Sequence, residues 1–179
     1  MYQGLLSGLL WGLGTVIMGV ALASSPFVSS EQAIFLAPFI STFIHDLCSS
    51  VWMLLYMGIK KQYSKVIRAL KTKSGKFIAL AALLGGPIGM TGYVLSIKHI
   101  GAAYTAIISA LYPAVGAFLS FIFLKENMKK YQMLGLAFSI GAIIVLGYSP
   151  EGNEVGRGLI GFLFAMICVM GWASEAVII

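Results

Sequence analysis

Charged residues are scarce in this 179-residue chain, at 10% of the total, whereas 59% of the residues are hydrophobic. The mean hydropathy is +0.94. Soluble domains carry about 25% charged residues. This composition therefore excludes an ordinary soluble domain and indicates a membrane protein.

Cysteine is also rare, with only Cys48 and Cys168, and both lie inside apolar runs. Thiols in such positions usually behave as small hydrophobic groups, so we expect no disulfide. The chain shows no Ser-His-Asp arrangement, no metal-ligand cluster and no phosphate-binding glycine loop. We therefore expect neither an enzyme nor a bound cofactor or metal.

Acidic residues number six against twelve basic ones, which gives a net charge of +6. Nine of the basic residues are confined to two short segments between apolar runs. A nucleic-acid-binding protein would instead gather them on one solvated face. The charge therefore indicates membrane orientation, and we expect no nucleic-acid partner.

Six apolar runs approach or exceed the roughly 20 residues needed to span a bilayer as a helix. The fold class predicted is all-α, a polytopic membrane helix bundle with six transmembrane helices. We expect the first run to be a retained helix and not a signal peptide, because no Lys or Arg precedes it. The runs are 2–22, 33–58, 76–98, 102–124, 131–148 and 158–179.

The connections between these runs predict the orientation. The segments 59–75 and 125–130 are basic and are separated by two helices, so they lie on one side, which should be cytoplasmic. The N-terminus is then cytoplasmic as well. The connection at 99–101 is short enough to require a tight hairpin.

A carboxylate in the last run is the most informative single residue. An acidic side chain at the centre of a membrane helix costs about 3 kcal/mol, so Glu175 should face a cavity, a partner or a substrate. Trp172 lies three residues earlier, on the same helical face. An anion beside an aromatic ring is the combination that binds an organic cation.

The segments 11–17 and 172–178 resemble each other, with the sequences WGLGTVI and WASEAVI. Five predicted helices separate their starts, so a repeat of this length would be inverted in the membrane. We therefore predict a first five-helix repeat at 1–150 and the first helix of a second repeat at 151–179. The chain would then form about half of a ten-helix, inverted-repeat transporter.

Further polar and aromatic residues lie inside the predicted spans. Trp11, Tyr93 and Tyr112 are too far from the segment ends for an interfacial belt, and we interpret them as lining a cavity. His45 and Asp46 form a structural hydrogen-bonded pair or, alternatively, a proton relay or cation contact. A helical stripe in the second run is expected to face the same interior; it comprises Ser41, His45, Ser49, Trp52 and Tyr56.

Small and kinking residues predict how the helices approach one another. Gly4, Gly8 and Gly12 form a ridge along the first run that would admit another helix closely. Pro87 should kink the third run.

The third to fifth runs resemble the EamA-type repeat of the drug/metabolite transporter superfamily. The resemblance rests on four elements: Tyr93-x4-Lys98-x-Ile100-Gly101-Ala102-Ala103; Leu111-Tyr112-Pro113; Phe123-Leu124-Lys125-Glu126-Asn127; and Gly135 with Gly141. It implies a ten-helix transporter with a central substrate cavity in the bacterial plasma membrane. The chain departs from the pattern by stopping after six helices.

The segment 172–178 also resembles the choline permeases of bacterial lic operons. This resemblance implies choline uptake, with Glu175 and several aromatic residues forming the site. The expected partners are the lipid bilayer and a small cationic solute, and a homodimer is left open.

The leading hypothesis is a permease for a small quaternary ammonium cation, most simply choline. Its candidate substrate-binding residues are Glu175, Trp172, Trp11, Tyr93, Tyr112, His45 and Asp46. One alternative is a transporter of another amine, an amino acid or a drug-like metabolite. The other is a non-transporting membrane fragment whose charges only hold helices together.

Overall fold

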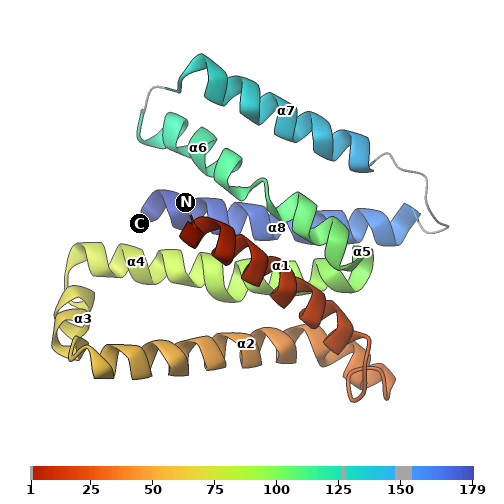
Figure 1. The fold of residues 1–179 in the computed structure, drawn as a ribbon, viewed down its shortest axis with the longest axis horizontal. Coiled ribbons are helices and arrows are strands. Elements are labelled where there is room, and N and C mark those ends of the chain that lie inside the picture. Colours follow the sequence, from red (N-terminus) through yellow and green to blue (C-terminus); the bar gives the residue numbers. More distant parts are fainter. Residues whose placement is uncertain (1, 126–127, 148–154) are drawn as a thin grey trace.

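The protein is described here by a computed structural model that covers residues 2–125, 128–147 and 155–179. Every regular element in these ranges is helical (Figure 1). The elements are α1 (Tyr2–Leu22), α2 (Glu31–Ile59), α3 (Tyr63–Leu70), α4 (Lys73–Leu83), the π-helix η1 (Leu84–Met90), α5 (Thr91–Ser109), α6 (Tyr112–Phe123), α7 (Lys130–Gly147) and α8 (Val155–Ile178).

The surface of this bundle is apolar, as expected of a protein that contacts lipid. Large hydrophobic side chains along α1, α2, α7 and the lipid-facing side of α8 are exposed, whereas Thr15, Ser96, Thr105 and Ser109 are buried. Four helical stretches are long and apolar enough to cross a membrane. They are Gly4–Leu22, Glu31–Ile59, Lys73–Ser109 and Gly158–Ile178. The chain is thus a multi-pass helical membrane protein.

The predicted hairpin at 99–101 is a sharp break inside α5. Gly101 has φ 81° and ψ 166°, a backbone conformation that glycine adopts without steric cost. Thr105 donates a hydrogen bond to the Gly101 carbonyl over 2.8 Å, and its hydroxyl also pairs with that of Ser96 at 2.9 Å. These buried contacts tie together the two halves of α5, and the chain turns back toward α6 (Figure 1).

The predicted apolar runs are helical, but four stretches of the described residues, and not six, are long and apolar enough to cross a membrane. Two further differences concern the boundaries of the elements. The run 102–124 is divided between the end of α5 and α6, because the helix stops at Ala110 and restarts at Tyr112 with Pro113 in its first turn. The basic connection 59–75, predicted as a loop, contains α3. The run 131–148 forms α7, and its last residue, Tyr148, lies outside the described residues.

Pro87 widens the helix that contains it. Proline has no N–H to donate to the carbonyl four residues earlier, here that of Leu83. The chain passes through this position as the π-helix η1, so α4, η1 and α5 follow one another without a loop. Local π-helical winding of this kind is typical of functional sites in helices.

α8 is the central element of the fold. It packs against α4, η1, α5 and α6, and Ala165, Cys168, Val169 and Ala173 on it are completely buried. Glycines permit this packing: a Cβ on Gly92 would lie 2.8 Å from the Phe164 carbonyl oxygen. Helices associate in this way in lipid, where close van der Waals contact replaces the hydrophobic effect.

The predicted glycine ridge of α1 contacts none of the other helices described. No atom among the described residues lies within 4 Å of a Cβ built on Gly4, Gly8 or Gly12. α1 instead approaches α5 near Gly19, whose Cβ would lie 3.2 Å from that of Ala102. A small-residue pattern shows where a helix can be approached, and the packing of the described helices uses Gly19 instead.

We expect Gly92→Ala to destabilise the protein. The added methyl group would press on the backbone of α8 and force α5 and α8 apart, at a cost of about 1–3 kcal/mol. The midpoint of thermal unfolding in detergent should fall. Gly135→Ala is the matched control, because no described atom lies within 4 Å of its Cβ. A Gly92→Ala protein that unfolds at the wild-type temperature would contradict the close packing of α5 on α8.

Candidate functional site

Trp172 on α8 contacts three other aromatic side chains. Its ring centroid is 5.2 Å from that of Trp11, 5.3 Å from Tyr93 and 5.6 Å from Tyr112. Trp11 and Tyr93 are also 5.5 Å apart. These distances are typical of edge-to-face and tilted aromatic contacts, and we call the four residues the aromatic cluster. The structure thus brings together the four aromatic residues singled out in the sequence, from α1, α5, α6 and α8.

The π-helix η1 contacts the Trp172 side chain and orients its ring. The indole Nε1 donates a hydrogen bond to the Gly85 carbonyl oxygen over 3.0 Å. A Cβ on Gly89 would lie 2.9 Å from both Cδ1 and Nε1 of the same ring. Only a residue without a side chain leaves room for the indole at this position. The ring is therefore oriented by one hydrogen bond and one glycine.

Glu175 lies against the same segment. A Cβ on Gly85 would almost coincide with the Glu175 carboxylate. The carboxylate and the Trp172 indole N–H thus meet at a single glycine. The side chain of Glu175 is partly exposed. Trp172 and Glu175 lie on one face of α8, as predicted. This face is directed toward η1 rather than toward lipid.

A short hydrogen-bonded chain fixes the other side of the cluster. The Thr15 hydroxyl donates to the Trp11 carbonyl over 3.0 Å, which uses its only proton. The Tyr93 hydroxyl is therefore the donor in its own contact with Thr15 Oγ1. Both groups are buried, so this contact holds α1 and α5 together inside the bundle.

The cluster has one buried member and two that are open. Tyr93 is 2% exposed, whereas Trp11 is 44% and Tyr112 is 39% exposed. Part of the Trp11 and Tyr112 side chains is therefore not covered by the described residues. Accessible aromatic faces and a nearby carboxylate are the groups with which a protein binds an organic cation.

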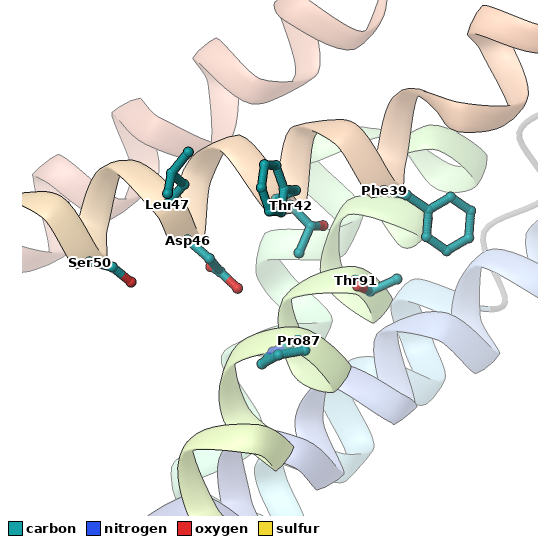
Figure 2. A pocket seen from close by; sticks show the side chains of 8 residues that line it. Phe39, Thr42, Asp46, Leu47, Ser50, Pro87 and Thr91 are labelled. Carbon is teal, nitrogen blue, oxygen red and sulfur yellow. The ribbon is translucent and has the colours of Figure 1, made fainter. Parts of the chain in front are cut away.

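His45 and Asp46 lie apart from the cluster. The His45 Nδ1 and Asp46 Oδ1 atoms are 3.0 Å apart, and the two side chains are 41% and 34% exposed. Asp46 faces a groove of about 420 Å³ between α2 and η1 (Figure 2). The groove is lined by Phe39, Thr42, Phe43, Asp46, Leu47, Ser50, Pro87 and Thr91.

The two carboxylates thus approach η1 at neighbouring glycines. Asp46 Oδ2 lies 3.8 Å from a Cβ built on Gly86, and the Glu175 carboxylate lies at Gly85. Trp172 is not among the residues that line the groove. The aromatic cluster thus lies outside the groove that Asp46 lines, while the Glu175 and Asp46 carboxylates both lie against η1.

The rest of the predicted stripe on α2 is not directed inward. Ser41 is buried, but Ser49 is exposed, and Trp52 and Tyr56 are 74% and 53% exposed. The buried residues of α2 are Ala37, Pro38, Ser41 and Thr42, all in its first half. The second half of α2 is therefore not covered by the other helices described.

Sequence reasoning did not assign roles to the partners that orient the cluster. These are the Gly85 carbonyl, the Gly89 backbone and the Thr15 hydroxyl. Pro87 was the available signal for the first two, because a proline inside a membrane helix disturbs the backbone hydrogen bonds around it. The sequence gives no comparable signal for the pairing of Thr15 with Tyr93.

Comparison with known proteins identifies the family of this chain. No solved structure matches this chain. Protein LicB of Haemophilus influenzae (strain ATCC 51907 / DSM 11121 / KW20 / Rd) is 34% identical over 177 residues, which are 98% of this chain and 56% of LicB. The chain thus spans little more than half the length of this relative. The model of the EamA-like transporter family matches residues 1–148. The chain therefore belongs to the EamA-like transporter family.

Proposed function

We propose that this chain is part of a permease that carries a small quaternary ammonium cation, most simply choline, into the cell. The observation that supports the proposal best is the contact of Trp172 with three other aromatic rings beside the Glu175 carboxylate. Family membership supports the transport activity, and the similarity to LicB is consistent with it.

The chemistry of the cluster fits this substrate class. A quaternary ammonium group cannot donate a hydrogen bond, so selectivity depends on aromatic faces and on one opposite charge. Each face contributes about 0.5–2 kcal/mol. The rings contact one another, so the cation would dock on the open faces of Trp11 and Tyr112 or displace one of them outward. Glu175 would neutralise the charge of the bound cation.

The inverted-repeat arrangement is part of the proposal. Trp11 and Trp172 occupy equivalent places in the two similar segments, and their rings are in contact. α1 and α8 run in opposite directions, as inverted repeats require (Figure 1). We infer a ten-helix transporter in which residues 1–150 form one repeat and 151–179 begin the second. Six transmembrane helices then fall within this chain.

Orientation and driving force follow from the charges. With the basic segments in the cytoplasm, the N-terminus is cytoplasmic and the protein resides in the bacterial plasma membrane. A monovalent cation entering the cell then gains about 2.3 kcal/mol per 100 mV of membrane potential. This energy is sufficient to accumulate choline roughly 50-fold per 100 mV without another coupled ion.

The carboxylate is the first element to test. We expect Glu175→Gln to weaken choline binding at least tenfold, because the variant keeps the shape and removes the charge. Binding can be followed in the purified chain by tryptophan fluorescence, and uptake in cells that express the protein. Glu31→Gln is the control, since it removes a carboxylate from the exposed first turn of α2. Unchanged binding and uptake in Glu175→Gln would refute the proposal.

The aromatic faces can be tested separately. Tyr112→Phe should retain choline binding, whereas Tyr112→Leu should lose about 2- to 30-fold in affinity, since only the second substitution removes the π face. Isothermal titration with the two variants gives the comparison. Equal affinities of the two variants would show that the Tyr112 ring contributes only packing.

The wild-type chain also tests the alternative of a non-transporting fragment. If it shows no saturable binding of choline, that alternative is favoured.

A second candidate function rests on the groove beside Asp46. It has a carboxylate with hydroxyl groups of Thr42, Ser50 and Thr91 near it, which suits an amine that donates hydrogen bonds. If the transported solute is such an amine, Asp46→Asn should lower its uptake more than Glu175→Gln does. Competition of radiolabelled choline uptake by betaine and by polyamines distinguishes the two sites. The second candidate is favoured if polyamines compete strongly with choline uptake and if Asp46→Asn abolishes this competition.

A further inference from the structure

The short helix α3 differs in character from every other helix described. It joins α2 to α4 (Figure 1), and its apolar residues recur at i, i+3, i+4 and i+7. These residues are Tyr63, Val66, Ile67 and Leu70. Lys65 and Arg68 lie on the opposite side of the helix. α3 is therefore amphipathic, in a protein whose other helices are apolar over most of their surface.

The apolar side of α3 is uncovered in the structure. Tyr63, Val66, Ile67 and Leu70 are 43%, 36%, 57% and 51% exposed, and α3 has no buried residue. An apolar helix face of this size requires contact with lipid or with protein. Its position at the junction of two membrane-length helical stretches places it at the bilayer boundary.

α3 is nevertheless held in a fixed place. The Tyr63 hydroxyl donates to the Leu54 carbonyl of α2, and a Cβ on Gly58 would lie 2.9 Å from the same hydroxyl. At the other end, Thr72 caps α4 by accepting a hydrogen bond from the Gly75 N–H and also donates to the Ala69 carbonyl. α3 is thus a positioned element rather than a loose connection.

The charge of this region is uniform. Residues 59–75 contain six basic side chains and no acidic one, so no group within the segment neutralises them. The bases are Lys60, Lys61, Lys65, Arg68, Lys71 and Lys73. Basic clusters next to a membrane helix attract the anionic headgroups of the adjacent leaflet.

We propose that α3 is an interfacial helix that binds anionic phospholipids. Tyr63, Val66, Ile67 and Leu70 enter the acyl-chain boundary, and the surrounding basic side chains contact the phosphates of lipids with a net negative charge. This inference is independent of the transported solute. It assigns α3 the role of anchoring the ends of α2 and α4, and α4 leads directly into the η1 segment that holds Trp172.

A local probe of lipid contact tests this assignment. The chain is reconstituted in phosphatidylcholine bilayers, with exposed Cys48 replaced by Ala and a fluorophore attached through Ile67→Cys. Quenching is then compared between spin-labelled phosphatidylglycerol and spin-labelled phosphatidylcholine. We expect at least a fivefold preference for phosphatidylglycerol at this probe, which 0.5 M salt should reduce.

Matched charge variants show whether the basic side of α3 is responsible. Lys61→Gln, Lys65→Gln and Arg68→Gln together remove three of the six basic side chains of this segment and should lower the preference at least twofold. Lys125→Gln, Lys129→Gln and Lys130→Gln remove the same charge from the other basic segment and should leave it largely intact. Equal unfolding midpoints exclude misfolding as the cause of any difference.

Three outcomes would overturn the proposal. Equal quenching by both lipids in the wild-type chain would show that α3 does not select anionic headgroups. A probe that neither lipid quenches would show that Ile67 faces water or is covered by protein. An equal loss of preference in both triple variants would assign the effect to total charge rather than to α3.

Discussion

The close approach of α8 to η1 is the contact on which the remaining features of this protein depend. It requires Gly85, Gly89 and Gly171, because a Cβ on any of them would overlap with atoms of the facing helix. In lipid, such backbone contact is a main source of helix association, since apolar side chains gain little by leaving an apolar solvent. Without these glycines, neither Trp172 nor Glu175 could lie against the π-helix.

The same contact connects stability with the proposed chemistry. The Trp172 indole is oriented by the Gly85 carbonyl, and Trp172 in turn contacts Trp11, Tyr93 and Tyr112. A cation site built on these rings would be preorganised by the packing of α8 rather than by loops. Such rigidity lowers the cost of ordering side chains when a ligand binds.

Polar groups divide the interior into two environments. Around Tyr93 and Thr15 each buried hydroxyl has a partner, whereas on α2 the hydroxyls of Ser41 and Thr42 are buried without one among the described residues. Thr42 lines the groove that contains Asp46. The buried hydroxyls of Tyr93 and Thr15 are therefore paired, whereas the groove is lined by a hydroxyl that has no partner among the described residues.

The sequence by itself determined the membrane class, the approximate helices, the family and the four aromatic residues that meet, because hydropathy, motif spacing and helical faces are local properties of the chain. The tertiary structure decided which faces are used. It left Trp52 of the α2 stripe exposed, placed the Asp46 and Glu175 carboxylates against neighbouring glycines of η1, and formed the helix α3 within a basic connection. These outcomes depend on which backbones can approach each other and on how Pro87 alters the helix between them, and neither is encoded in the periodicity of any one segment.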